Sequence, residues 1–172
     1  MNLNLYILQL KLKVAELILQ LLRLQTGKVV NPDRRLALYE TARMNLEKDL
    51  VPDENDLACA AHLNQVFKKA FGREIGGNYS TYRMYQVLRT DYRFQRVLTP
   101  LAGDIIISPT GYAGSGGVIP NGHVGLCSDN GKIMSNDSQS GLWTENYDMD
   151  SWRLRYVKFG KFPMLFYRVI SG

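Results

Sequence analysis

Two residues of this chain carry the side chains that thiol chemistry requires, Cys59 and His123. Cys59 follows Asp56, a residue suited to capping a predicted helix that starts there. The start of a helix offers unpaired backbone N–H groups and the positive end of its dipole, and both lower the pKa of a thiol. The same N–H groups stabilise the oxyanion that forms when a thiolate attacks a carbonyl. The position suits a cysteine nucleophile, and it also suits a small buried residue between two alanines.

The base that such a nucleophile needs must be one of two histidines, His62 or His123. His62 lies one helical turn after Cys59 and would form only a local pair with it. His123 opens a short predicted strand directly after a long glycine-rich loop, where an imidazole can face a cleft. We therefore expect His123 to be the base; the competing interpretation is a hydrogen-bonded structural histidine.

A third, orienting residue is expected on the strand that follows His123. The segment HVGLCSDNGKIMSNDS is typical of a hairpin with its turn at Asn130-Gly131. With a two-residue turn, or one placed a residue earlier, Asn136 shares a face with His123, because faces alternate with period two. Its amide oxygen would then hold the imidazole tautomer, as the third member of a triad does. A three-residue turn would instead favour Asp137 or Ser135, and Asn136 would be an ordinary strand residue.

The same residue types could also bind zinc. Cys59 and His62 form one possible ligand pair, and His123 and Cys127 form a second. On an extended strand, positions four apart are separated by ~13 Å, so the second pair could not share one ion unless the strand bends sharply. We therefore expect neither a metal nor another cofactor. The chain has two cysteines, which do not make a disulfide framework.

Predicted helices come first in the chain and predicted strands follow. Hydrophobic periodicity and capping residues predict helices over Asp33–Lys48, Asp56–Phe71 and Thr81–Arg89. Short apolar runs predict strands over Phe94–Leu98, Asp104–Ser108, His123–Ser128, Lys132–Asn136 and Met164–Ile170. Helices followed by an antiparallel sheet indicate an α+β fold.

The beginning of the chain has a different character. Residues 1–26 are rich in leucine, and Leu10, Val14, Leu17, Leu21 and Leu24 recur at helical spacing. Charged residues interrupt the run, so no apolar stretch of ~18 residues could span a membrane, and the features of a signal peptide are missing. We expect an amphipathic leader helix over 1–26 that docks, self-associates or lies on a membrane, followed by one domain over 27–172.

Composition restricts the function classes. The chain has 172 residues, of which 45% are hydrophobic and 22% are charged, as in ordinary soluble domains. The net charge of +5 attracts anionic polymers, including nucleic acid, anionic lipid and cell wall. The basic residues are scattered, without the runs typical of nucleic-acid binding, so we expect no nucleic-acid partner.

Several segments together resemble CHAP-type peptidoglycan hydrolases, including phage endolysin-like domains. LACAAHLNQVFKKAFG resembles their nucleophile helix, and LAGDIIISPTGY resembles the strand and loop that precede the histidine. NGHVGLCSDNGKIMSNDS resembles the histidine hairpin, and Trp152–Ile170 resembles the closing strand. The pieces stand in the order of the family, over about Asp33 to Ile170.

The resemblance implies a papain-like fold, with N-terminal helices packed on a small antiparallel sheet, and hydrolysis of an amide bond in peptidoglycan. It assigns the nucleophile to Cys59, the base to His123 and the orienting role to Asn136, where many relatives have Glu, Asp or His. The chain would be made in the cytoplasm without a signal peptide, act at the bacterial cell wall and be phage- or prophage-encoded. The alternative is a catalytically degenerate module that binds cell wall or serves a phage structure.

Three further residues are candidates for binding the substrate. Asn55 is a candidate second oxyanion donor, because it lies just before the predicted nucleophile helix. Tyr112 and Trp143 could border the cleft, or they could be ordinary loop and core aromatics. The sequence leaves open whether the bond that is cut joins sugar to peptide or lies in the stem peptide or cross-bridge.

Overall fold

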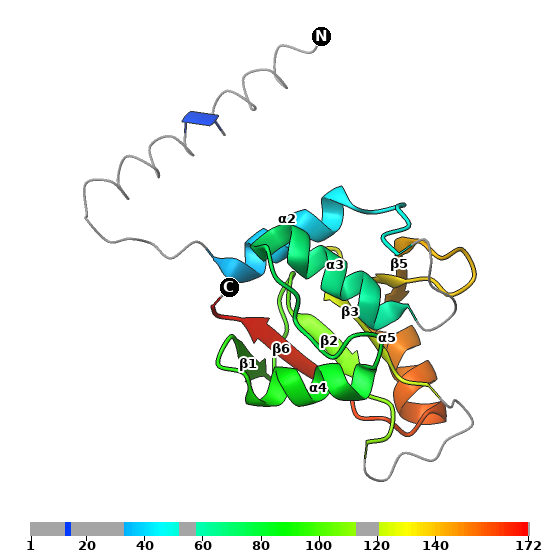
Figure 1. The fold of residues 1–172 in the computed structure, drawn as a ribbon. Helices are drawn as coiled ribbons and strands as arrows, with labels where there is room; N and C mark the ends of the chain where they lie inside the picture. Colours follow the sequence, from blue (N-terminus) through cyan, green and yellow to red (C-terminus); the bar gives the residue numbers. More distant parts are fainter. Residues whose placement is uncertain (1–12, 15–32, 52–57, 113–120, 172) are drawn as a thin grey trace. The chain divides into compact units, whose positions relative to one another are not determined.

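The structure is a computed structural model that describes residues 13–14, 33–51, 58–112 and 121–171 (Figure 1). The chain divides into two units, residues 1–32 and 33–172. In the first unit the described residues, Lys13 and Val14, are helical. The rest of the predicted leader helix and the linker after it lie outside the described residues. Among the helices that the structure does describe, none is both long and apolar enough to cross a membrane.

The second unit is built on a six-stranded antiparallel sheet with the order β1-β6-β2-β3-β4-β5. The strands are β1 (Phe94–Val97), β2 (Ile105–Ser108), β3 (His123–Cys127), β4 (Lys132–Asn136), β5 (Trp143–Asp148) and β6 (Leu165–Val169). The central strands β2 and β3 are buried along their whole length. Burial on both faces explains why their sequences, IIIS and HVGLC, are almost continuously apolar.

Three helices precede the sheet in the chain, as predicted: α2 (Arg34–Met44), α3 (Cys59–Phe71) and α4 (Thr81–Thr90). Asp33 caps α2 by accepting hydrogen bonds from the backbone of Arg35 and Leu36, and Ser80 caps α4 in the same way. Gly72, in the left-handed conformation at φ +74°, ends α3. The α+β class predicted from the sequence is therefore the class of the observed fold.

The two faces of the sheet are covered by different elements. The helices α2, α3 and α4 pack with one face, in a core that includes Leu63, Phe67, Val124, Leu126 and Met134. The other face carries a smaller core of Ile106, Cys127, Ile133, Trp152, Tyr156, Phe162 and Phe166. Figure 1 shows the orange segment that covers this second face lying away from α2 and α3.

The strand predicted over Met164–Ile170 is observed as β6 (Leu165–Val169), but the segment before it differs from the prediction. Residues 152–170 resembled one closing strand, but only β6 is extended there. Before it, α5 (Met149–Trp152) continues into a π-helix, η1 (Arg153–Phe159). Trp152 and Tyr156, four residues apart, are both buried, and this spacing fits a helix as well as a strand, so it does not distinguish the two. The sequence analysis also missed β5, whose residues other than Trp143 are only half-buried.

Candidate active site

Cys59 is the first residue of α3, so it lies at the dipole-positive end of a 13-residue helix. The predicted start at Asp56 was too early, because the helix begins at Cys59, and its N-cap, Ala58, makes no side-chain capping hydrogen bond. Asp56 itself, and the candidate oxyanion donor Asn55, lie outside the described residues. The first turn of α3 therefore presents its backbone N–H groups beside the sulfur.

The thiol of Cys59 is neutral rather than ionised. Burial raises its pKa to about 11, although the backbone N–H groups of Ala60, Val124 and Cys59 itself act in the opposite direction. Only 8% of Cys59 is exposed. The expectation that the helix start yields a thiolate is therefore wrong for this state. Burial removes water from the thiolate, and this destabilises the anion more than the three backbone N–H groups stabilise it.

The contact between Cys59 and Val124 brings the sulfur to the beginning of β3, one residue after His123. Val124 and Cys59 belong to the same core as α3. Faces alternate along a strand, so the side chain of His123 points to the opposite face, where its ring contacts Trp152 and Tyr156. Among the described residues, no hydrogen bond joins the sulfur of Cys59 to the His123 ring.

The hairpin after His123 has a three-residue turn, the alternative that favours Ser135 or Asp137. The backbone N–H of Ser128 donates to the carbonyl of Lys132 at 2.8 Å, and Gly131 takes φ +78° between them. This register pairs Gly125 with Ser135. Ser135, not Asn136, therefore shares the face of His123.

Ser135 and Asn146 form a relay behind the imidazole. Nε2 of His123 lies 3.0 Å from Oγ of Ser135, which donates to Oδ1 of Asn146 at 2.6 Å. Nδ2 of Asn146 in turn donates to the carbonyl of Asn136 at 3.3 Å, which fixes the orientation of the Asn146 amide. Because the Ser135 proton goes to Asn146, the His123 contact requires a proton on Nε2. Nδ1 is then the nitrogen that can accept a proton.

Asn146 reaches Ser135 because β4 and β5 are out of register at a bulge. Ile133 pairs with Tyr147 and Met134 with Glu145, so Asn146 is the extra residue. Sequence reasoning missed Asn146 because it did not predict β5. A run such as WTENYD has the aromatic ends of a strand, but nothing in it marks the bulge.

An aromatic box encloses the imidazole of His123. Tyr156 stacks on it at 5.3 Å between ring centroids with 10° between planes, and Tyr147 and Trp152 meet it at 5.7 and 5.4 Å. Burial, reinforced by the Arg155 guanidinium, lowers the pKa of His123 to about 3. The imidazole is therefore neutral at ordinary pH, and the same burial makes it a weak base in this state.

Asn136 and Trp143 do not take the positions expected of them. They pair across β4 and β5, and both are buried, with exposed fractions of 3% and 0%. Trp143 is thus a core residue, not the border of an open cleft. Oδ1 of Asn136 and Nε1 of Trp143 have no hydrogen-bond partner among the described residues. The prediction that Asn136 faces His123 is wrong, because it assumed a shorter turn.

His62 and Cys127 have structural surroundings. The ring nitrogens of His62 lie 3.1 Å from the carbonyls of Ala58 and Gly141, which ties α3 to the turn before β5. Cys127 is buried in the second core. Within the described part of the chain, no group of three or more His, Cys, Asp or Glu side chains could hold a metal ion.

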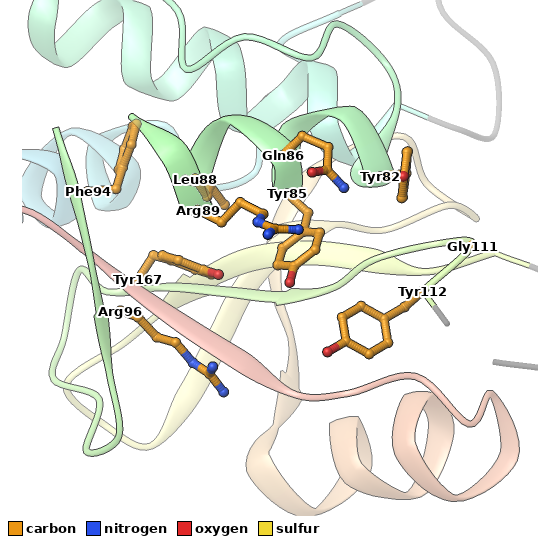
Figure 2. A pocket seen from close by; sticks show the side chains of 10 residues that line it. All are labelled: Tyr82, Tyr85, Gln86, Leu88, Arg89, Phe94, Arg96, Gly111, Tyr112 and Tyr167. Atoms are coloured by element: carbon orange, nitrogen blue, oxygen red, sulfur yellow. The ribbon is translucent and has the colours of Figure 1, made fainter. Parts of the chain in front are cut away.

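Tyr112 lies at a cavity of about 670 Å³ between α4 and the strands β1 and β6 (Figure 2). Its ring meets that of Tyr85 edge-on, with 5.7 Å between centroids. The described lining of this cavity does not include Cys59 or His123. The sequence suggested that Tyr112 borders the catalytic cleft. Tyr112 does border a pocket, but the described lining of that pocket is separate from Cys59 and His123.

Comparison with known proteins identifies a fold, not a family. No family model matches the chain, and no curated protein matches it. A chain in the crystal structure of the type VI native effector–immunity complex Tae3–Tai3 from Ralstonia pickettii is similar, with a TM-score of 0.50 and 18% identity. The similarity covers 78% of this chain and 98% of that chain. At this identity it shows the shared α+β fold alone.

Proposed function

We propose that this chain is a cysteine hydrolase of papain-like fold that cleaves an amide bond in peptidoglycan, with Cys59 as nucleophile and His123 as base. The observation that supports the proposal is a thiol at a helix start that contacts the backbone of Val124, the residue next to His123, although the His123 ring lies on the other face of β3. The orienting role passes from Asn136 to Ser135, backed by Asn146. As in the proposal from sequence, the chain acts at the bacterial cell wall.

The reaction begins from a neutral thiol and a neutral imidazole. Nδ1 of His123 takes the proton of Cys59 as Sγ bonds to the substrate carbonyl carbon, and the carbonyl oxygen becomes an oxyanion. The imidazolium then protonates the amine as the carbon–nitrogen bond breaks. Nδ1 next takes a proton from water as the water oxygen attacks the thioester, and returns it to Sγ as the carbon–sulfur bond breaks and the carboxylic acid leaves. In the described structure the two side chains lie on opposite faces of β3, so the first step requires a rearrangement at the start of β3 that brings Nδ1 within hydrogen-bond distance of Sγ.

The donors for the oxyanion are the backbone amides at the start of α3. The N–H groups of Cys59 and Ala60 already interact with the sulfur. A tetrahedral oxyanion on the attacked carbon would lie beside the same amides, and each such donor contributes about 3 kcal/mol in well-studied hydrolases. Asn55, outside the described residues, remains our candidate for an additional donor.

Peptidoglycan as the substrate rests on the sequence resemblance and on charge. The net charge of +5 favours an anionic polymer, and the stem peptides of peptidoglycan carry carboxylates. The similar chain from the effector–immunity complex supports the proposal at the level of fold. The comparisons lend no support to the phage or endolysin part of the resemblance.

A second candidate function is cell-wall binding without turnover. The burial of Cys59, with its pKa raised to about 11, favours this alternative, because an enclosed neutral thiol is a poor nucleophile. The two candidates differ in whether the wall is cut or only bound.

Wall lysis by two matched cysteine variants tests the proposal. Cys59→Ala should abolish the release of peptides and sugars from purified peptidoglycan while leaving the circular dichroism spectrum unchanged. Cys127→Ala removes the other buried cysteine, on the opposite face of the sheet, and should keep most of the activity. Lysis that survives Cys59→Ala would refute Cys59 as nucleophile. Wall binding by the unmodified protein without any released fragment would establish the second candidate. Mass spectrometry of the fragments identifies the bond.

A further inference from the structure

The cavity between α4 and the strands β1 and β6 has the chemistry of an anion site. Arg89 comes from α4 and Arg96 from β1, and the polar lining also includes Tyr82 and Gln86 besides three tyrosines, Tyr85, Tyr112 and Tyr167. Figure 2 shows the hydroxyl ends of these tyrosines and the guanidinium of Arg96 directed toward a common space, with the Arg89 guanidinium beside Tyr85. The described lining contains no Asp or Glu.

Several of the described arginines pair with carboxylates, and Arg89 and Arg96 are not among them. Arg93 pairs with Asp91 at 2.7 Å, and Arg168 pairs with Asp104 at 2.7 Å. Within the described residues, neither Arg89 nor Arg96 takes part in an ion pair. A guanidinium that faces a pocket without an internal anion is available to bind a carboxylate with two parallel hydrogen bonds.

The positive charges of both arginines influence the same group of the pocket, the hydroxyl of Tyr167. Tyr167 is 3% exposed and lies at its floor, where burial raises the pKa of its hydroxyl. The guanidiniums of Arg96 and Arg89 both act to lower that pKa, so the positive potential of both reaches one buried hydroxyl. Arg89 also lies over the ring of Tyr85, 5.8 Å from its centroid, which restrains the long side chain.

The rings around the arginines suit the body of a larger ligand. Tyr85 meets Tyr112 and Tyr167 with 5.7 and 6.5 Å between centroids, so the rings form a continuous wall. Tyrosine walls bind sugars and peptide chains by apolar contact while their hydroxyls donate hydrogen bonds. The volume of about 670 Å³ can hold several residues of a peptide.

We propose that this pocket binds a carboxylate of the peptidoglycan stem peptide, held by Arg89 and Arg96 against the tyrosine wall. This assignment rests on the proposed function for the identity of the ligand, because the stem peptide is the carboxylate-bearing part of that substrate. The pocket would hold the substrate away from the cleaved bond, since its described lining excludes both Cys59 and His123.

The test measures binding with turnover removed. The full chain carrying Cys59→Ala is titrated by calorimetry with a soluble muropeptide that has free carboxylates, and with the same muropeptide after amidation. We expect R89Q and R96Q each to weaken binding of the free-acid form about tenfold, the effect of one charged hydrogen-bonded contact. R83Q is the matched control, because Arg83 is an exposed arginine on α4 outside the pocket lining, and its affinity should not change.

The outcomes separate this site from the catalytic proposal. Equal weakening by R83Q would show general charge attraction and would overturn the site, as would unchanged binding in both R89Q and R96Q. The amidated muropeptide should bind about tenfold more weakly than the acid, and R96Q should add no further loss. Arginine-dependent binding without lysis by the unmodified protein would keep the pocket and remove the hydrolase. Lysis without arginine-dependent binding would keep the hydrolase and reject the pocket as a binding site. Displacement of the muropeptide by inorganic phosphate at similar concentration would show an unselective anion site and refute the assignment.

Discussion

The reactive residues on the two faces of the sheet have different surroundings. On the α3 face, Cys59 lies in the larger hydrophobic core, which holds aliphatic and aromatic side chains, and two buried polar atoms in the sheet, Oδ1 of Asn136 and Nε1 of Trp143, have no described partner. On the face of α5 and η1, His123 lies among aromatic rings, with its Nε2 bonded to a relay of Ser135 and Asn146. The base is thus fully oriented, whereas the nucleophile is only enclosed. The hydrogen bonds around His123 fix one tautomer of its ring, whereas the reactive geometry of Cys59 forms only when the substrate binds.

The largest expected effect is that of removing the base. His123→Ala should lower kcat/KM for peptidoglycan fragments by at least about 10³-fold, because proton transfer to and from the substrate is lost. The measurement is initial rates of fragment release, with folding checked by near-ultraviolet circular dichroism. Activity within tenfold of that of the unmodified protein would show that His123, on the face of α5 and η1, is not the base.

Acid should destabilise the protein through the same histidine. The pKa of His123 falls from an ordinary 6.5 to about 3 in the folded state, so the unfolded chain binds a proton first. The stabilising contribution is complete above pH 6.5 and is lost as pH falls toward 3, on the order of a few kcal/mol. Urea unfolding of the unmodified protein and of His123→Phe between pH 7 and 4 checks this. A parallel pH dependence in the two proteins would assign the acid sensitivity to other groups.

Cys59 should react slowly with alkylating agents. With its pKa raised to about 11 from 9.0, the thiolate fraction at neutral pH is about a hundredfold below that of a free thiol. In Cys127→Ala, the rate of modification by iodoacetamide should therefore be about a hundredfold below that of the same protein in urea, and should still rise between pH 9 and 10. A rate that levels off below pH 8 would show an ionised cysteine and a more open site.

The relay behind His123 should matter less than the base itself. Ser135→Ala removes the acceptor of Nε2–H and frees the other tautomer, which should lower kcat by roughly tenfold to a hundredfold. The variant should also shift the acid limb of the pH profile of kcat/KM. A packing defect alone would not cause this shift, so the pH profile distinguishes the two explanations. Ser135→Thr, which keeps the hydroxyl, should restore most of the rate. A fold-preserving Ser135→Ala with unchanged kinetics would remove Ser135 from the mechanism.

Asn136→Ala should have the smallest effect. The side-chain oxygen of Asn136 has no described partner, so its removal should change kcat less than about threefold and stability by about 1 kcal/mol or less. Comparing it with Ser135→Ala in the same assay sharpens the assignment. A larger kinetic loss in Asn136→Ala would return the orienting role to the residue first expected from the sequence.

Much of the fold could be predicted because it depends on local patterns. Helical periodicity located α2, α3 and α4, and continuous apolar runs located β2 and β3, since burial leaves these patterns in the residues themselves. Half-buried β5 and the π-helix η1 left weaker patterns. Of the site, the helix start at Cys59 and the strand start at His123 could be anticipated, but the partner of His123 could not.

The sequence by itself determined which residues can do chemistry here: two cysteines, two histidines and the order helix, strand and hairpin that brings Cys59 toward β3. Only the tertiary structure decided the partners and the charges. The three-residue turn at Gly131 and the bulge at Asn146 set which side chains share a face, and a shift of one residue reverses that outcome. Burial then reversed the expected ionisation of Cys59, because desolvation depends on every neighbour at once and is not visible in residue spacing.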